Sequence, residues 1–398
     1  MIDWRGRAPR RVAVVHDWLV NYAGSERVLE QLLLLLPDAD LYAVVDFVPA
    51  AERGFLGGRR ARTTFVQRLP LARTKYRAYL PLMPLAVEQL DLSGYDLVVS
   101  SSHAVAKGVL TDPDALHVCY CHSPLRYAWD LQHAYLRESG LGWGPSGLLA
   151  RALLHRLRVW DARAALGVDV FVANSAFIAR RIAKAYRRPA AVVYPPVDTD
   201  AFTPAPGGER PPAPDGGGPY YVAASRFVPY KRMPMIVDAF RALPDRRLVV
   251  IGDGPDRRAV ARAAGPNVTL LGPRPPAELR AWLRGARAYL FAAVEDFGIA
   301  PVEAQACGTP VVAYAGGALP ETVPGLDAAE PCGVLYGEQS ARGLADAVRA
   351  FERAADRVTA AACRRNAERF SVGTFRGRMA ALLADAYAAH ERALRAAA

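Results

Sequence analysis

Short apolar runs rich in Val, Ala, Leu and Tyr alternate along the chain with longer segments of helical periodicity. In the first half, such runs span residues 11–17, 41–47, 96–102, 116–122, 170–175 and 191–197. Continuously apolar strands separated by helices are typical of a parallel sheet that is buried on both faces. We therefore predict a doubly wound α/β domain over residues 1–202.

A Pro/Gly-rich stretch then interrupts the pattern. Residues 203–219 read TPAPGGERPPAPDGGGP and have no periodicity, so we predict a linker there. After it, apolar runs return at 220–227, 247–254, 268–273, 288–296, 310–316 and 333–337. We predict a second doubly wound domain over residues 220–375 and a C-terminal helix at 376–398, which could pack back on the first domain. Two such domains in series imply a ligand cleft between them.

Composition narrows the class of protein. The chain of 398 residues is long enough for two domains, and its hydrophobic content of 52% is that of a globular protein. We find no secretion signal and no membrane-spanning stretch, and the five scattered cysteines fit a reduced, cytoplasmic protein. The net charge of +11 favours polyanions, without choosing among nucleic acid, anionic lipid and phosphorylated small molecules.

Two glutamates flank a turn in the second domain. In residues 288–303, AYLFAAVEDFGIAPVE, we predict Glu295 at the end of a buried strand and Glu303 in the first turn of the next helix. A helix N-terminus offers free N–H groups and a partial positive charge to a phosphate or to sugar hydroxyls. The simpler alternative is that neither glutamate binds a ligand. Glu295 would then be a charge at the end of a strand, and Glu303 would complement the helix dipole.

Two cations follow the first strand of this domain. Arg226 and Lys231, in SRFVPYKRMP, could hold a diphosphate, or could belong to an ordinary solvated basic turn. The sequence has no P-loop, no Gly-x-Ser-x-Gly elbow and no Asp-x-Asp metal clamp at the end of a predicted strand. We therefore predict that no metal is bound, and that a diphosphate would be neutralised by these cations and by helix dipoles.

Polar residues also end the predicted strands of the first domain. His16, His103 and His122 each lie at the carboxyl end of a strand, so we expect them to converge on one edge as a titratable wall. Gly24 lies in a small loop before a helix and is another candidate site for an anion or a hydroxyl.

Together these motifs resemble glycosyltransferase family 4. The resemblance rests on Glu295 and Glu303 with FGIAPV between them, on SRFVPYKR, on AGGALPE, and in the first domain on HDWLVNYAGSERVLE, SSHAVAKGV and CYCHSPLRYAWD. It covers nearly the whole chain. It implies the GT-B fold, with two Rossmann-like domains facing across a cleft, and retention of the anomeric configuration. The first-domain motifs look like those of mannosyltransferases that build bacterial surface polysaccharides.

The resemblance also implies roles for the matched residues of the second domain. Glu303 would bind the ribose hydroxyls of the nucleotide, and Glu295 would contact the donor sugar. The backbone of Phe297, Gly298 and Ile299 would hold sugar hydroxyls and phosphate.

Further roles are implied for both domains. Arg226 and Lys231 would hold the diphosphate and stabilise it as it leaves. His122 would lie near the donor sugar, with His103 as a less closely matched second residue. Gly24 would let its loop approach the phosphates or the acceptor, although Ala23 stands where many members carry a second glycine.

We therefore expect a retaining hexosyltransferase that moves mannose from GDP-mannose to a saccharide acceptor, lipid-linked, in bacterial surface polysaccharide synthesis. It would need no cofactor besides the nucleotide sugar. The alternatives are a UDP-sugar-dependent transferase or a nucleotide-sugar epimerase of the same fold, and, in another class, a non-catalytic basic nucleotide-binding module. Nucleic acid is not expected, because aromatic and basic residues are not interleaved as in RNA-binding proteins.

Two segments suggest a peripheral position on the inner face of the plasma membrane. Residues 53–87 contain eight basic residues and no acidic one, with tyrosines and leucines among them. Farther on, the apolar residues of one helix face oppose a basic face; the apolar residues are Leu149, Leu153, Leu157 and Trp160, and the basic ones Arg151, His155 and Arg158. Such surfaces suit an anionic leaflet. The alternative is that the first segment is a solvated basic loop and the second is a helix of the protein core.

Overall fold

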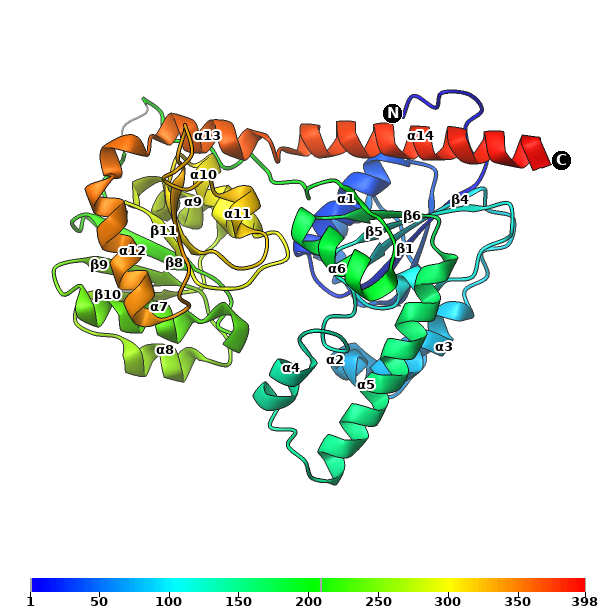
Figure 1. The fold of residues 1–398 in the computed structure, drawn as a ribbon, viewed down its shortest axis with the longest axis horizontal. Coiled ribbons are helices and arrows are strands. Elements are labelled where there is room, and N and C mark those ends of the chain that lie inside the picture. The colour runs from blue at the N-terminus through cyan, green and yellow to red at the C-terminus, as the bar shows by residue number, and fades with distance from the viewer. Residues whose placement is uncertain (1, 208–209, 398) are drawn as a thin grey trace. The chain divides into compact units, whose positions relative to one another are not determined.

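The computed structural model describes residues 2–207 and 210–397 and divides the chain into two compact units. Unit 1 comprises Met1–Pro196 and Phe375–Ala398, and unit 2 comprises Val197–Thr374 (Figure 1). The chain therefore leaves unit 1 once and returns to it through the last helix.

Unit 1 is built on a seven-stranded parallel sheet with the strand order β3-β2-β1-β4-β5-β6-β7. The strands are β1 (Val12–Leu19), β2 (Asp40–Asp46), β3 (Arg62–Thr63), β4 (Leu97–Ser102), β5 (Leu116–Cys121), β6 (Val170–Ala173) and β7 (Ala191–Val192). Every strand predicted for this half is present. Only β3 was missed, because two residues are too few to carry an apolar pattern.

Helices cover both faces of this sheet. They are α1 (Gly24–Leu35), α2 (Ala72–Lys75), α3 (Met83–Glu88), α4 (Gln132–Glu138), α5 (Pro145–Ala164), α6 (Ala176–Tyr186) and α14 (Val372–Ala397). The apolar residues of α1 pack with those of α14 on one face, and α3 and the second half of α5 pack on the other. The final helix is part of the unit 1 core, since Phe375, Met379 and Leu383 are buried there.

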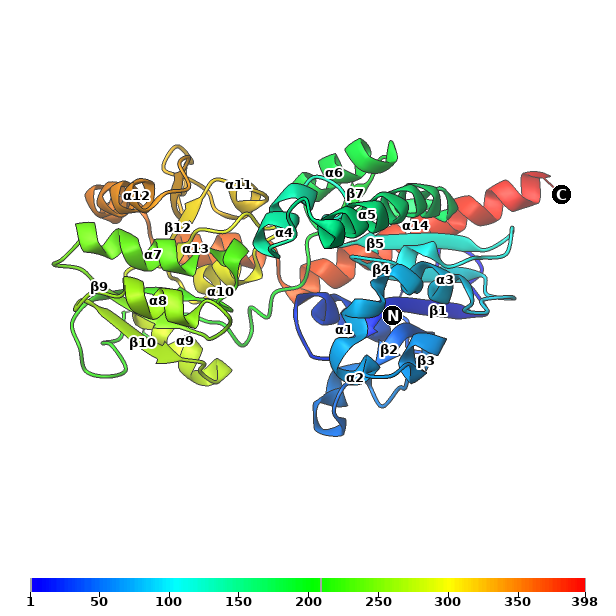
Figure 2. The same cartoon turned by 90° about the horizontal axis from the view of Figure 1, so that it is seen from below.

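Unit 2 repeats this architecture with a six-stranded parallel sheet of order β10-β9-β8-β11-β12-β13 (Figure 2). The strands are β8 (Tyr220–Ala224), β9 (Arg247–Ile251), β10 (Val268–Gly272), β11 (Tyr289–Phe291), β12 (Val311–Tyr314) and β13 (Gly333–Tyr336). The helices are α7 (Met233–Ala239), α8 (Arg257–Ala263), α9 (Pro276–Gly285), α10 (Ile299–Ala306), α11 (Leu319–Thr322), α12 (Ala341–Arg353) and α13 (Ala360–Glu368). Every predicted strand of this half is present, and the prediction of two doubly wound α/β domains is confirmed.

The division between the units falls at Pro196 rather than at residue 202. The N–H of Val197 donates to the carbonyl of Phe370 at 2.9 Å, and the Arg364 guanidinium donates to the carbonyl of Thr199 at 2.7 Å. These bonds tie residues 197–202 to unit 2.

The predicted linker at 203–219 also belongs to unit 2. The Arg284 guanidinium donates to the carbonyl and the hydroxyl of Thr203 at 2.7 and 2.8 Å, Asp215 pairs with Arg247, and Ala213 is buried. The Pro/Gly composition therefore marks a segment without regular structure that packs on its unit. Gly208 and Glu209 lie outside the described residues.

Each sheet reverses its strand order once, between β1 and β4 in unit 1 and between β8 and β11 in unit 2. The loops that follow the two strands at such a reversal run in opposite directions, which leaves a crevice at the carboxyl ends of the strands. The loops after β1, β4, β8 and β11 are therefore where ligand-binding groups are expected, and they contain most of the residues predicted from the sequence.

Candidate active site

A pocket of about 390 Å³ opens at the carboxyl ends of β8, β9 and β10 in unit 2. Its walls combine apolar side chains, among them Ile251, Leu279 and Leu283, with the charged groups of Arg226 and Glu303. A volume of this order, mostly apolar with a few polar groups, is typical of sites for nucleotide-sized ligands.

The Glu303 carboxylate enters this pocket from α10. The helix begins at Ile299, earlier than the sequence suggested, so Glu303 lies in its second turn and not in its first. The early start follows from Gly298, which takes a left-handed φ of 91° and so turns the chain directly into the helix. The Glu303 side chain is almost completely buried, with 6% of its surface exposed.

Glu295 lies beyond the end of its strand, which corrects the prediction that the strand runs up to it. β11 ends at Phe291, and Glu295 instead forms an isolated bridge with Gly317. The φ of Gly317 is +70°, and a Cβ atom there would lie 2.1 Å from the Glu295 carbonyl oxygen. Only glycine permits this close approach. The glycines of AGGALPE thus serve to hold the backbone of Glu295.

Lys231 is already paired within this site. Its Nζ forms an ion pair with Oε1 of Glu295 and lies 5.4 Å from the centre of the Phe291 ring. Of the two cations predicted to hold a diphosphate, Arg226 is exposed and has no carboxylate partner among the described residues. An ammonium group has three N–H donors, so Lys231 keeps donors for a further acceptor.

The N-cap residue of α10 is Gly298, which has no side chain, so the N–H groups of the first helical turn receive no hydrogen bond from an N-cap side chain. Phe297, just before it, is buried with its ring edge-on to Phe370 at 5.4 Å. The structure thus brings Phe297, Gly298 and Ile299 into one turn beside Glu295, and their binding role stays a prediction.

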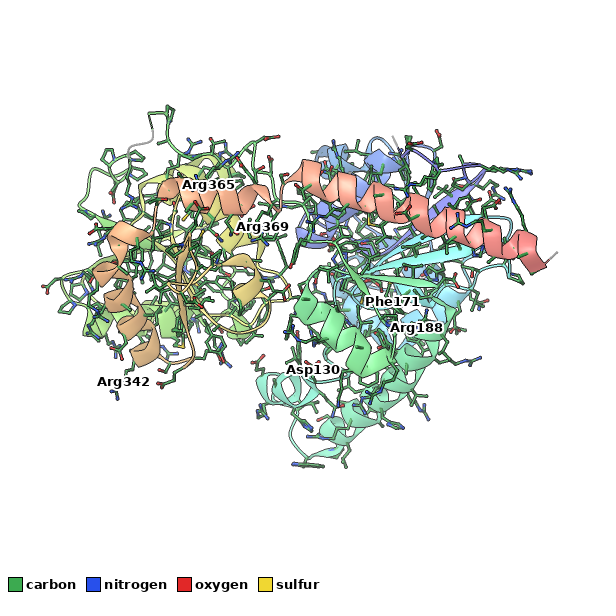
Figure 3. All side chains as sticks on the ribbon, turned by 45° about the horizontal axis from the view of Figure 1, so that its top comes forward. Asp130, Phe171, Arg188, Arg342, Arg365 and Arg369 are labelled. Carbon is green, nitrogen blue, oxygen red and sulfur yellow. The ribbon has the colours of Figure 1, made fainter. Side chains whose placement is uncertain are left out.

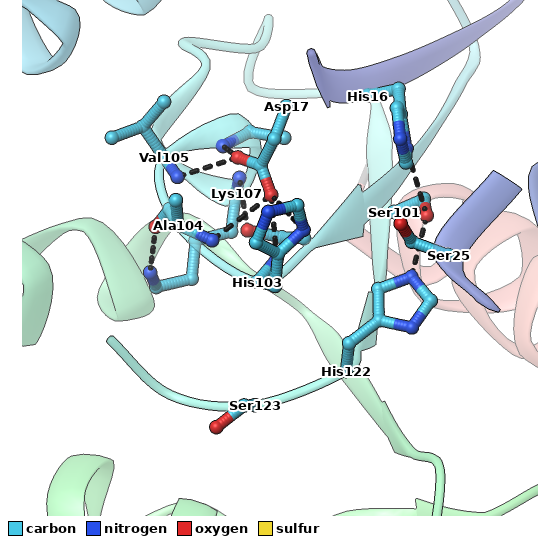
Figure 4. Close-up of polar contacts among 12 residues, drawn as sticks. His16, Asp17, Ser25, Ser101, His103, Ala104, Val105, Lys107, His122 and Ser123 are labelled. Carbon is cyan, nitrogen blue, oxygen red and sulfur yellow. Dashed lines mark hydrogen bonds and ion pairs between the residues drawn. The ribbon is translucent and has the colours of Figure 1, made fainter. Parts of the chain in front are cut away.

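Three histidines converge in unit 1 at the reversal between β1 and β4 (Figure 4). The ring centres of His16 and His103 lie 6.4 Å apart, and those of His103 and His122 lie 6.3 Å apart. The expected convergence is confirmed. The placement of His16 at a strand end is wrong, because β1 continues to Leu19 and buries His16 inside the sheet.

Sequence reasoning missed Asp17, which organises the loop after β4. Its carboxylate is completely buried and accepts the backbone N–H groups of residues 103–106 at 2.6–2.9 Å. Nδ1 of His103 lies 3.0 Å from Oδ2 of Asp17. Burial by itself raises the pKa of Asp17, but the charge of His103 and the hydrogen bonds from it outweigh burial and hold the pKa well below its usual range. The sequence did contain a signal for this role, because an aspartate within an otherwise apolar, buried strand needs hydrogen-bond partners inside the protein.

His122 follows β5 and is kept neutral. Burial lowers its pKa to about 3, and the charge of His103 acts in the same direction. Its loop is held by its neighbours: the Asn174 side chain donates to the carbonyl of His122 at 3.0 Å. Arg181 pairs with Asp130, which is labelled in Figure 3, and donates to the hydroxyl of Ser123 at 3.0 Å.

Gly24 is the first residue of α1 and not, as predicted, a residue of the loop before it. The N–H of Ala23 and the hydroxyl of Ser25 both donate to Oε2 of Glu26, at 3.0 and 3.1 Å. Oε1 of the same carboxylate lies 3.4 Å from Nε2 of His16. Glu26, which sequence reasoning also missed, therefore joins the Gly24 loop to the histidines.

No group of three or more His, Cys, Asp or Glu residues within the described ranges is placed to hold a metal ion. The charged groups of both sites are instead the cations, carboxylates and imidazoles described above.

Comparison with known proteins identifies the family. Two family models match consecutive parts of the chain: Glycosyltransferase Family 4 over residues 22–201, and Glycosyl transferases group 1 over residues 209–370. This chain belongs to glycosyltransferase family 4. Both halves are matched, so the assignment covers the sheets of both units.

Curated relatives of this glycosyltransferase match it over part of their length. The GDP-mannose-dependent alpha-(1-6)-phosphatidylinositol monomannoside mannosyltransferase of Mycolicibacterium smegmatis is 35% identical over 179 residues, which are 39% of this chain and 46% of the relative. The D-inositol 3-phosphate glycosyltransferase of Mycobacterium sp. strain KMS is 37% identical over 152 residues, 33% of each chain. The matched part thus spans less than half the length of these relatives.

Solved structures share the fold over nearly the whole chain. HepE of Anabaena, solved with UDP and glucose, has a TM-score of 0.63 at 18% identity and covers 94% of this chain and 99% of its own. Sucrose-phosphate synthase of Thermosynechococcus elongatus has a TM-score of 0.69 at 18% identity, with 96% and 100% covered. These likenesses confirm the predicted GT-B fold class.

Proposed function

We propose that this glycosyltransferase moves mannose from GDP-mannose to a saccharide acceptor, with retention of the anomeric configuration. The observation that carries the proposal is the pocket of about 390 Å³ at the carboxyl ends of the unit 2 strands, with Arg226 and Glu303 in its wall. The choice of donor is supported by the relative from Mycolicibacterium smegmatis, whose name states that it depends on GDP-mannose.

Four charged side chains of unit 2 then have a task in binding the donor. The buried Glu303 carboxylate accepts hydrogen bonds from the ribose hydroxyls. Arg226, Lys231 and the N-terminus of α10 surround the diphosphate with N–H donors and positive charge. Fixed donors of this kind stabilise the charge that develops on a leaving group, and they do so without a metal ion. Glu295, held in place by Lys231 and Gly317, contacts the donor sugar.

The acceptor hydroxyl must lose a proton as the new glycosidic bond forms. As the bond between the anomeric carbon and the diphosphate oxygen breaks, the acceptor oxygen bonds to the same face of that carbon. The proton passes to the departing diphosphate. This scheme retains the configuration and needs neither a covalent nucleophile on the protein nor a separate general base.

A donor screen followed by a transfer assay tests the proposal. GDP-mannose at a hundred times its Kd should stabilise the protein by about 2.7 kcal/mol, and UDP-, ADP- and dTDP-sugars should not. Labelled mannose should then appear in an acceptor, or as free mannose through slow hydrolysis. If only UDP-sugars stabilise the protein, the donor is a UDP-sugar and not GDP-mannose. If the product is an epimerised nucleotide sugar, the protein is an epimerase and not a transferase. Binding with no turnover for any acceptor would leave a nucleotide-binding module.

We further propose that the acceptor is lipid-linked and that unit 1 sits on an anionic membrane surface. In the segment that follows β3 and runs into α3, the exposed leucines Leu71, Leu82 and Leu85 lie close in sequence to the exposed cations Arg73, Lys75 and Arg77. Exposed apolar and cationic side chains together favour an anionic interface, by about 1 kcal/mol for each basic residue. The described part of the chain has no helix with the length and apolar character needed to span a bilayer.

The structure corrects the second membrane-binding surface predicted from the sequence. Leu157 is buried and Trp160 packs against the same core, so the second half of α5 is a core helix. The start of the helix, by contrast, is apolar and exposed. Leu149 is 62% exposed there, and Trp143, just before the helix, is 79% exposed with Arg151 stacked on its ring at 4.2 Å. The tip of α5 therefore supports the membrane proposal, and the rest of the helix does not.

Co-sedimentation with liposomes tests the membrane proposal. Binding should require anionic lipid, weaken with salt, and fall when Arg73, Lys75 and Arg77 are replaced by Ser. The matched control replaces three exposed arginines of α8 in unit 2, Arg257, Arg258 and Arg262, by Ser. This control removes the same charge and should leave binding unchanged. Equal losses in both triple variants would show that net charge alone drives binding and would overturn the assignment of the surface.

A further inference from the structure

A chain of hydrogen bonds runs from the first turn of α1 to His122. Oε1 of Glu26 lies 3.4 Å from Nε2 of His16, and Nδ1 of His16 lies 3.1 Å from Oγ of Ser101. The same Oγ lies 2.8 Å from Nε2 of His122, and Figure 4 shows these last two links. Glu26, His16 and Ser101 are all buried, so water does not compete for these bonds.

The carboxylate at one end sets the direction of the whole chain. Burial raises the pKa of Glu26, but its hydrogen bond with His16 outweighs burial, and the pKa is lowered overall. Oε2 of the same carboxylate also accepts from the N–H of Ala23 and from the hydroxyl of Ser25. An ionised carboxylate only accepts hydrogen bonds, so Nε2 of His16 must carry the proton. With one proton on the ring, Nδ1 of His16 accepts from the Ser101 hydroxyl. The Ser101 oxygen then has only lone pairs to offer, and Nε2 of His122 must donate to it.

We infer that Glu26, through His16 and Ser101, holds His122 in the tautomer that is protonated on Nε2, so that its Nδ1 accepts a hydrogen bond from a sugar hydroxyl of the substrate. Glu26, His16 and Ser101 are positioning residues in this scheme, and His122 alone contacts the substrate. The inference rests on the proposed function, because it assigns this edge of unit 1 to a sugar.

The chemistry of a bare Nδ1 limits what it can bind. No described residue forms a hydrogen bond with Nδ1 of His122, and the residue is half-buried at the strand edge. A neutral imidazole nitrogen without a proton attracts a hydroxyl donor. It repels a phosphate oxygen, since both groups would be acceptors. His122 therefore suits a sugar hydroxyl and not the diphosphate.

A second Ser–His pair on the same two strands supplies a contrast. Oγ of Ser100 lies 2.8 Å from Nε2 of His117, but Nδ1 of His117 lies 3.0 Å from the carbonyl oxygen of Gly167. A carbonyl only accepts, so His117 carries its proton on Nδ1. Ser100 and Ser101 are consecutive in β4 and point to opposite faces of the sheet. The two Ser–His pairs thus hold opposite histidine tautomers, because the His117 ring also donates to a backbone carbonyl, whereas the Ser101 hydroxyl also donates to His16.

Nitrogen NMR of the full chain with ¹⁵N-labelled histidine decides between the tautomers without any need for activity. We expect the His122 signal of the Nε2-protonated form and the His117 signal of the Nδ1-protonated form. Ser101→Ala should give a mixture of tautomers at His122, whereas the matched control Ser100→Ala should leave His122 unchanged. Ser101→Thr, which keeps the hydroxyl, should restore the wild-type signal, and Glu26→Gln should disturb it if the alanine variant does not fold.

Kinetics then test the role of the tautomer. Ser101→Ala should lower kcat about tenfold, the equivalent of one neutral hydrogen bond, with the KM for the nucleotide sugar unchanged. Ser100→Ala should stay within about twofold, since its pair lies on the other face. If the wild-type spectrum shows His122 protonated on Nδ1, the hydrogen bonds run in the opposite direction from a doubly protonated His16, and the inference is overturned.

Two other results separate the parts of the argument. If Ser101→Ala changes the tautomer but not kcat, the role of the tautomer in catalysis is overturned. If the wild-type protein transfers no sugar, the proposed function is overturned, while the tautomer assignment stands.

Discussion

Replacing Asp17 by Asn should destabilise unit 1 strongly. Each carboxylate oxygen accepts two backbone N–H groups: Oδ2 those of His103 and Ala104, and Oδ1 those of Val105 and Ala106. The amide keeps one oxygen and turns an NH₂ group toward the other two donors. Two charge-assisted hydrogen bonds are lost at about 1.5–3 kcal/mol each, so we expect a loss of about 3–6 kcal/mol in the free energy of unfolding at pH 7.

The pH dependence of this loss follows from the lowered pKa of Asp17. A carboxyl whose pKa is lower in the folded state stabilises the fold above its unfolded pKa of about 3.9, and this stabilisation disappears as the pH falls toward the folded value. The advantage of the wild type over the variant should be constant from pH 7 to pH 5. Below about pH 4 it should shrink by up to about 1.4 kcal/mol per pH unit.

Urea unfolding followed by tryptophan fluorescence measures both effects. Most of the six tryptophans belong to unit 1, so the signal reports mainly on that unit; these are Trp4, Trp18, Trp129, Trp143 and Trp160. The control is Asp91→Asn in the same unit, since the exposed Asp91 also accepts a backbone N–H, that of Ser93, at 3.0 Å. The control should change stability by less than about 0.5 kcal/mol. A change below about 1 kcal/mol for Asp17→Asn, or a difference that grows below pH 4, would refute the reasoning.

Three further outcomes follow from the unit 2 site. Arg226→Ala removes stabilisation of the leaving group and Glu303→Gln removes ribose binding, so each should lower turnover at least about a hundredfold with an unchanged melting temperature. Near-normal rates would contradict the assignment of these residues to the active site. Activity should survive excess EDTA because fixed cations neutralise the diphosphate, and a strict need for a divalent ion would contradict that account. Gly317→Ala should destabilise the protein by more than about 2 kcal/mol and misplace Glu295, because its Cβ would overlap the Glu295 carbonyl; wild-type melting would show that the bridge can relax.

The elements that the sequence determined by itself are those whose signal is local. Parallel strands buried on both faces are continuous apolar runs, so both sheets could be predicted strand by strand, except for the two-residue β3. The turn motif around Glu295 and Glu303 is local too, and together with the other short motifs of both domains it predicted the family. The element boundaries were predicted less well. β11 ends before Glu295, and α10 starts early enough to place Glu303 in its second turn, because the positive φ of Gly298 and the bridge to Gly317 depend on contacts beyond the motif.

The relations between distant residues were decided only by the tertiary structure. Asp17 binds a loop more than 80 positions away, and His16 meets Ser101 across two paired strands. No local pattern encodes such a partner, since it depends on which strands lie side by side and in which register. The amphipathic pattern of α5 was ambiguous for a related reason. An apolar face packs equally well against a protein core or a lipid, and only the packed structure shows that Leu157 faces the core while Trp143 is left exposed.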